Sequence, residues 1–303
     1  TQDHLKRTMM APSSSTGNKL PGYFLLTGLF LLVIGMFYGV LCGFQYLIQG
    51  FLKSWFSFDK VRPLHVSLVV FWIILGASGS VLTYVQEHTG KGLRWPLLAS
   101  VQLVVFVLSI LAILFSYVFG MFGGREYWEF NPWFALPITL GWVMFVINFI
   151  ASIGSLKNQP VYVWQWLTGV IFFLFTFLES YLWVIPYFRD NVINDMTVQW
   201  KSYGSMVGAW NMLIYGCSMF LMTKISGDQS IAHSRMAFAL YFTGLFNLMF
   251  NWGHHIYTLP TYDFIKHISY LVSMTDLVIL GRIIWLWKAS VLESRKHLHF
   301  TPY

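Results

Sequence analysis

The chain has 303 residues, of which 56% are hydrophobic and only 10% are charged, and its net charge is +7. So apolar a composition excludes an ordinary soluble domain and predicts an integral membrane protein. The positive charge does not indicate a nucleic-acid partner, because the basic residues are spread over many connecting segments and form no basic groove.

Eight apolar runs follow one another along the chain, and most of them contain no formal charge. Each run is long enough to cross a bilayer as a helix, and helices are expected because an isolated strand cannot satisfy its backbone in lipid. The sequence therefore predicts an all-α, polytopic membrane helix bundle with about eight transmembrane helices. The runs are Leu20–Gly50, Val66–Gln86, Trp95–Gly120, Pro132–Leu156, Val161–Phe188, Val198–Thr223, Ile231–His255 and Ile268–Trp287.

The connecting segments are too short to fold as a second domain. We expect one membrane domain at residues 20–290, between cytoplasmic tails at 1–19 and 291–303. With the N-terminus inside, eleven Lys and Arg residues fall on the inner side and seven on the outer side, as the positive-inside rule favours. This bias predicts a multi-pass protein of the inner (cytoplasmic) membrane, in contact with lipid. The inner residues are Lys6, Arg7, Lys19, Lys91, Arg94, Lys157, Lys224, Arg235, Lys288, Arg295 and Lys296; the outer ones are Lys53, Lys60, Arg62, Arg125, Arg189, Lys201 and Lys266.

His65 stands at the start of the second run, two residues after Pro63. Proline is a good helix-opening residue, so we expect His65 within or near the first helical turn. One interpretation is that a ring nitrogen of His65 is an axial ligand of a haem iron. The alternative is an interfacial histidine that is hydrogen-bonded to water or to a lipid head group.

His254 and His255 end the seventh run, next to Gly253. Odd runs lead outward and even runs lead inward in this topology, so both histidines are expected near the outer face, at the depth of His65. Imidazoles suit copper, iron or zinc, although two of them seldom make a tight site. The alternative is a polar end of a helix. Three histidines at one depth nevertheless favour a buried redox cofactor.

Glu126 and Glu129 lie three residues apart in an outer connecting segment. Their carboxylates could bind calcium, although such a pair is more often a solvated part of a loop. Glu179, Asp276 and Arg282 are the charges predicted deepest in the membrane, where each could serve a proton path or a partner contact.

Five stretches together resemble subunit I of the haem-copper oxidase superfamily, especially the cbb-type oxidases and the nitric oxide reductases. They occur in the order and at the spacing of that family over nearly the whole chain. The stretches are Val61-Arg62-Pro63-Leu64-His65-Val66-Ser67, Arg125-Glu126-Tyr127-Trp128-Glu129, Pro160-Val161-Tyr162-Val163-Trp164-Gln165-Trp166, Val198-Gln199-Trp200 with Tyr203-Gly204, and Gly253-His254-His255 through Leu259-Pro260.

The resemblance implies a role for each candidate residue. His65 matches the histidine that ligates the low-spin haem, which implies a b-type haem. His254 and His255 match two of the three histidines that hold the active-site copper, or iron in the reductases. Glu126 matches a carboxylate that helps bind calcium beside the haem propionates, with Glu129 close by.

The chain departs from the family pattern at three points. Ser205 stands where the third active-site metal ligand is expected, and serine is a poor replacement for imidazole. The region Phe246-Asn247-Leu248 lacks the tyrosine of the oxygen-reducing members. The family has at least twelve spans, whereas this sequence has eight and a basic tail at Lys288–Tyr303, so we expect that it cannot build the dinuclear centre alone.

Three hypotheses follow. The chain could be the N-terminal part of a split subunit I, with haem held between His65 and a histidine of a partner subunit that supplies the missing spans. It could instead be a degenerate, non-catalytic structural subunit of a respiratory complex, or an unrelated transporter or scaffold. In the first case, electrons are expected from a cytochrome c domain or from quinol, and oxygen or nitric oxide would be reduced only together with partner chains.

Overall fold

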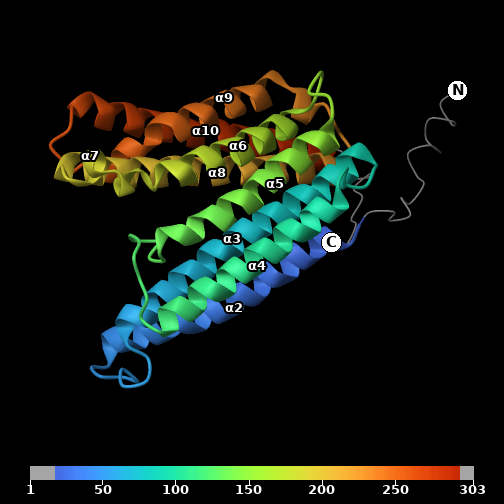
Figure 1. Cartoon of the computed structure of the whole chain (residues 1–303). Helices are drawn as coiled ribbons and strands as arrows, with labels where there is room; N and C mark the ends of the chain where they lie inside the picture. The colour runs from blue at the N-terminus through green and yellow to red at the C-terminus, as the bar shows by residue number, and fades with distance from the viewer. Residues whose placement is uncertain (1–17, 294–303) are drawn as a thin grey trace, which may run out of the picture.

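The computed structural model describes residues 18–293, apart from the side chains of residues 276 and 290–293. Throughout this described part every regular element is helical and none is a strand (Figure 1). The α-helices are α2 (Leu20–Leu47), α3 (Phe58–Thr89), α4 (Pro96–Val118), α5 (Ala135–Ile153), α6 (Val161–Glu179), α7 (Pro186–Arg189), α8 (Val192–Ser226), α9 (Arg235–Phe250) and α10 (Asp263–Glu293). Short 3-10 helices are η1 (Pro132–Phe134), η2 (Leu182–Val184), η3 (Ile231–His233) and η4 (Asn251–Ile256). The predicted tails fall almost wholly outside the described residues.

Seven segments of the described chain are long and apolar enough to cross a membrane as helices. They correspond to all the predicted runs except the seventh, Ile231–His255. That run is also helical, but it is divided into η3, the 16-residue α9 and η4. The prediction of an all-α membrane bundle is confirmed, and its seventh span is an interrupted helix.

The two ends of the described chain lie at the same end of the bundle. The backbone N–H that precedes α2 donates to Gln86, near the end of α3, at 2.8 Å. The neighbouring Glu87 lies 3.6 Å from Lys224, near the end of α8. Trp287, near the end of α10, donates to the carbonyl of Met222 at 3.3 Å. Because α2 begins where α10 ends, the chain passes along the bundle an even number of times.

Glycines allow α6 and α8 to pack closely. A β-carbon on Gly169 would lie 2.7 Å from Leu213, and one on Gly216 would lie 2.5 Å from Trp166. Small residues of this kind let membrane helices come together without a gap. Figure 1 shows two neighbouring groups of helices, α2 to α5 and α6 to α10, with α3 and α5 at their boundary.

Helix α3 begins earlier than expected. It starts at Phe58 after the extended Ser57, and the acidic Asp59 lies in its first turn, where the helix dipole favours a negative charge. Pro63 is therefore inside the helix and does not open it. The expectation that His65 lies in or near the first turn is wrong, because His65 is two turns into the helix.

Candidate functional site

The His65 ring is held against α2 by a hydrogen bond and by a close glycine contact. Its Nδ1 lies 2.8 Å from the carbonyl oxygen of Gly35. A carbonyl can only accept, so Nδ1 carries the hydrogen and the neutral ring keeps a lone pair on Nε2. A β-carbon on Gly39 would lie 2.7 Å from Cε1 of His65, closer than carbon atoms pack. Metal-binding histidines commonly have this arrangement, in which one nitrogen is fixed and the other is free to ligate.

Arg62 joins both candidate calcium carboxylates to the helix that carries His65. Its guanidinium lies 2.6 Å from Glu126 and 2.8 Å from Glu129. The second oxygen of Glu129, Oε2, is buried and has no hydrogen-bond partner in the described chain. Burial raises the pKa of Glu129 above its ordinary value, although Arg62 acts in the opposite direction. The two carboxylates are thus brought together, with a built-in cation between them.

The segment 121–131 that carries these carboxylates is tightly folded and fixed to α8. The Tyr203 hydroxyl donates to the carbonyl of Glu126 at 2.6 Å, and Arg125 forms an ion pair with Asp195. A β-carbon on Gly124 would lie only 1.8 Å from the carbonyl oxygen of Trp128, so only glycine fits there. The carboxylates therefore rest on a rigid support.

His254 and His255 lie in η4 with their ring centroids 4.0 Å apart. Nδ1 of His254 is 2.9 Å from Oδ1 of Asn251, while the His255 ring stacks on Trp200 at 5.9 Å. Both histidines are exposed. A β-carbon on Gly204 would lie 3.0 Å from His255, so η4 packs directly on α8 beside the position of the expected third ligand.

That position fits a metal poorly. Ser205 is buried, and a serine hydroxyl is a weak ligand for copper or iron. The described residues contain no cluster of three or more His, Cys, Asp or Glu side chains that could hold a metal ion. Among the described residues, the structure therefore brings together the two imidazoles of His254 and His255 without a third strong ligand beside them.

A cavity of about 290 Å³ lies between α3, α8, η4 and the segment 121–131. His255 lines this cavity and His65 does not. The α3 side chains that line it are Val70 and Ile73, which lie one to two turns beyond His65. The remaining lining residues are Tyr127, Trp128, Trp200, Tyr203, Met206, Val207 and Trp210. The structure thus places His255 at an aromatic cavity, whereas His65 faces α2.

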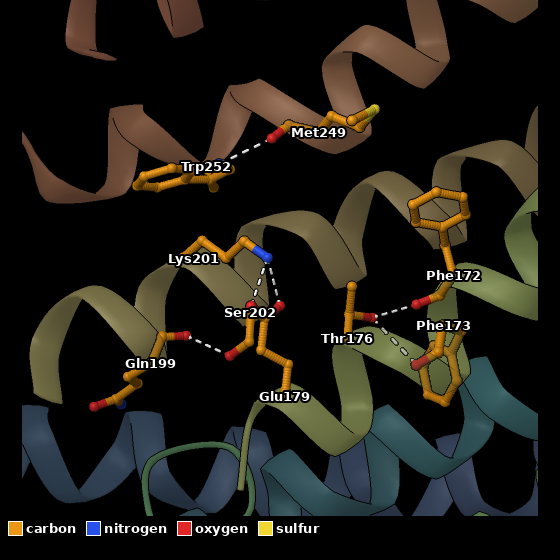
Figure 2. Close-up of polar contacts among 9 residues, drawn as sticks. All are labelled: Phe172, Phe173, Thr176, Glu179, Gln199, Lys201, Ser202, Met249 and Trp252. Atoms are coloured by element: carbon orange, nitrogen blue, oxygen red, sulfur yellow. Dashed lines mark hydrogen bonds and ion pairs between the residues drawn. The ribbon is translucent and has the colours of Figure 1, made fainter. Parts of the chain in front are cut away.

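Glu179, one of the three charges predicted to lie deep, is paired. Figure 2 shows Lys201 of α8 reaching the carboxylate at the end of α6, at 2.5 and 2.6 Å from its two oxygens. The ion pair links α6 to α8 at the end of the bundle that holds the other candidate residues. Arg282 is exposed on α10, and the side chain of Asp276 lies outside the described part.

Sequence reasoning missed three residues that organise the site. Arg62 has no assigned role in the sequence analysis, although it lies one helical turn before His65 and its positive charge could have been matched to the glutamate pair. Lys201 is assigned no role either. No sequence signal pointed to the hydroxyl of Tyr203 as a donor to a loop carbonyl.

Comparison with known proteins assigns the chain to a family. The family model described as "Cytochrome C and Quinol oxidase polypeptide I" matches residues 19–302. A nitric oxide reductase subunit of Stutzerimonas stutzeri is 24% identical over 297 residues, covering 90% of this chain and 55% of the relative. The cytochrome c oxidase subunit 1 homolog of Azorhizobium caulinodans is 25% identical over 249 residues, covering 77% and 44%.

A third relative, the Cbb3-type cytochrome c oxidase subunit CcoN1 of Stutzerimonas stutzeri, is 27% identical over 190 residues, covering 60% of this chain and 37% of the relative. The chain thus spans about half the length, or less, of these curated relatives. The family model covers almost the whole sequence, and the motifs that carry the resemblance lie within its match. The chain therefore belongs to the cytochrome c and quinol oxidase polypeptide I family, the subunit I family of the haem-copper oxidases.

Proposed function

We propose that the chain supplies the first eight spans of a haem-copper-oxidase-type subunit in a respiratory electron-transfer complex, with His65 as an axial ligand of a b-type haem. One observation carries this proposal. The hydrogen bond from Nδ1 of His65 to Gly35 leaves Nε2 as the free nitrogen of a ring that is already oriented. The second axial ligand would come from further spans, on the same polypeptide or on a partner chain.

In this proposal the protein tunes the haem through ligation, burial and charge. Arg62 lies one turn from His65, and its cation would face the negative propionates of a haem bound there. Electrons would come from a cytochrome c domain or from membrane quinol. The protein would sit in the inner membrane with the ends of its described part on the cytoplasmic side.

Two further ions belong to this proposal: calcium at Glu126 and Glu129, and copper or iron at His254 and His255. For both, the side chains present make an incomplete set of ligands. The orphaned Oε2 of Glu129 fits a calcium ligand, but Arg62 already neutralises part of the charge that such a cation would need. The pair of His254 and His255 fits copper or iron only if a partner chain supplies the third ligand, which Ser205 does not provide. Reduction of oxygen or nitric oxide would therefore require partner chains.

The test is a reduced-minus-oxidised absorbance spectrum of the native complex, purified with its partner chains. We expect the bands of a reduced b-type haem in the wild type and their loss in His65→Ala. His267→Ala, at the outer end of α10, is the matched control and should keep the bands. Bands that persist in His65→Ala would rule out this residue as the ligand.

A second candidate function is that of a degenerate, non-catalytic subunit. Ser205 at the third ligand position and the Arg62 cation between the glutamates favour it. In that case the complex would contain no haem attributable to this chain, yet deletion of the chain would prevent assembly. Membership of the oxidase family leaves no ground for the alternative of an unrelated transporter or scaffold.

A further inference from the structure

Helix α10 is the least buried of the seven helices that can cross the membrane. In the described chain only 12% of the residues in its apolar core are buried, against 28% to 61% in the other six. Arg282 is exposed on this helix, although it lies seven residues inside the end of the span at Ala289. We propose that the exposed face of α10 binds a transmembrane helix of a partner subunit, and that a carboxylate of that helix pairs with Arg282.

The two faces of α10 differ in burial. The face toward the bundle carries Ser269 and Ile283, which are 0% and 2% exposed. The residues on the opposite face are all exposed, and they recur every three or four positions, so they form one stripe along the helix. This outward stripe consists of Leu271, Met274, Val278, Arg282 and Trp285.

Arg282 has no counter-charge on its own face of the helix. Within the described chain, no ion pair joins it to a carboxylate. Position 276 is seven residues from both Ser269 and Ile283, so helical spacing places it on the face toward the bundle, away from Arg282. A charge within a membrane span is costly when it faces lipid, and such a residue usually faces a partner. The outward stripe is thus a surface that fits another protein better than it fits lipid tails.

The charge of Arg282 decides which protein fits. Two copies of this chain in one membrane share one orientation, so a two-fold axis along the membrane normal would bring equal depths of α10 together. Arg282 would then lie against the same residue of the second copy, and the like charges would repel because little water screens them there. The outward stripe therefore fits the helix of a different chain, with an aspartate or glutamate at the depth of Arg282.

The outward stripe continues into a surface groove at the outer end of α10. The groove has a volume of about 500 Å³ and is lined by Tyr257, Lys266, His267, Tyr270 and Leu271. Aromatic residues of this kind are enriched where proteins meet. Leu271 belongs to both the groove and the outward stripe, so one helix that lies along α10 can occupy both.

This inference deepens the proposed function and rests on it in one respect, because it requires a partner subunit in the membrane. It does not depend on haem. The pairing of Arg282 with a carboxylate would also fix the depth at which the partner helix lies, since a shift along the helix axis would separate the two charges.

The test is site-specific photocross-linking in native membranes. A p-benzoylphenylalanine at Val278, which is 71% exposed and one turn before Arg282, reacts with whatever covers the outward stripe. We expect a product that joins this chain to a different protein. Mass spectrometry should place the cross-linked peptide in a membrane span that contains an aspartate or glutamate.

The charge at position 282 should control the yield of this product. We expect Arg282→Glu to lower the yield about tenfold or more, because two carboxylates would then face each other. Arg282→Lys should keep most of it. Within the Arg282→Glu variant, exchange of the partner's identified carboxylate for lysine should restore the product, which also shows that the variant still folds.

Lys288→Glu is the matched control. Lys288 is another exposed cation of α10, but it is six residues from Arg282 and on another face, so its reversal should leave the yield unchanged. Cross-links only to lipid, to a second copy of this chain or to another span of the same polypeptide would overturn the proposal. An unchanged yield in Arg282→Glu would overturn it as well. His65→Ala should keep the cross-link, so a failure of the haem proposal leaves this result standing.

Discussion

Gly39 determines where the His65 ring can lie. Its missing side chain leaves room for the imidazole, and the neighbouring turn of α2 supplies the carbonyl of Gly35 that fixes the ring. The position of the His65 ring therefore depends on how α3 packs against α2, which the sequence of neither helix shows by itself.

We predict that Gly39→Ala displaces the His65 ring, because the added β-carbon would lie 2.7 Å from Cε1. Overpacking of this kind typically lowers the free energy of unfolding by about 1–3 kcal/mol. We also expect weakened or shifted haem bands in the reduced spectrum. Gly43→Ala, one turn further along α2, is the control, because a β-carbon there meets nothing within 4 Å. Equal behaviour of the two variants would contradict the assigned role of Gly39.

Arg62 is predicted to stabilise the segment that carries the glutamates. Arg62→Gln would leave Glu129 buried with an unpaired charge, and we expect a loss of about 1–3 kcal/mol in thermal or denaturant unfolding. Lys60→Gln is the control, since Lys60 is half-exposed and makes only a bond of 2.9 Å to the carbonyl of Val118.

The stability of Arg62→Gln should also depend on pH. Burial raises the pKa of Glu129 in the folded state above that in the unfolded state, and removal of Arg62 raises it further. Below both pKa values Glu129 is protonated in both states and the deficit is small. Above them the folded state must hold a buried charge, so the deficit grows as pH rises. A deficit that is constant across this range, or one that grows toward acid, would contradict the assignment; Glu129→Gln should remove the dependence.

The Arg62 contacts show why the site could be predicted only in part. The residue types and their order along the chain identified His65 and both glutamates as candidates. The order could not reveal that an arginine bridges the two carboxylates, because that depends on how the segment 121–131 folds back over the start of α3.

At the level of the helices, α6 and α8 pack closely because Gly169 and Gly216 have no side chain to keep the two backbones apart. We predict that Gly169→Ala destabilises the protein by about 1–3 kcal/mol, because its β-carbon would lie 2.8 Å from the backbone carbonyl of Ala209 and the helices would have to separate. Gly76→Ala is the control, because its nearest contact is a side-chain atom at 3.9 Å. Thermal unfolding of the purified protein in detergent measures the stability of both variants. A Gly169→Ala variant as stable as the wild type would show that the two helices do not pack this closely.

The start of α3 illustrates the limit of local sequence signals. Pro63 is a strong signal for a helix start, yet the helix begins at Phe58. A proline inside a helix removes one backbone hydrogen bond and crowds the carbonyl four residues earlier. The burial of Val61 and Leu64 in the core favours the helix in spite of that cost. Tertiary packing thus overrode the local preference and placed His65 deeper in its helix.

For the molecule as a whole, we predict that the chain crosses the membrane eight times, with residue 18 and residue 293 on one side. Single cysteines at positions 91, 157 and 228 should react with a membrane-impermeant maleimide only from the cytoplasmic side. Cysteines at positions 53, 125, 190 and 262 should react only from the outer side. Labelling of positions 228 and 262 from the same side would mean that the interrupted helix α9, which lies between them, does not cross, and the even number of passes would be wrong.

The sequence by itself determined the class of the protein and the order of its helices, and it proposed candidate residues for cofactor binding. Long apolar runs can satisfy their backbone in lipid only as helices, so composition and length suffice for that conclusion. Only the tertiary structure decided that His65 faces Gly35 and Gly39, that Arg62 stands between the glutamates, and that His255 borders an aromatic cavity. These features depend on contacts between helices distant in sequence, and such contacts are set by the packing of side-chain shapes that no periodic pattern encodes.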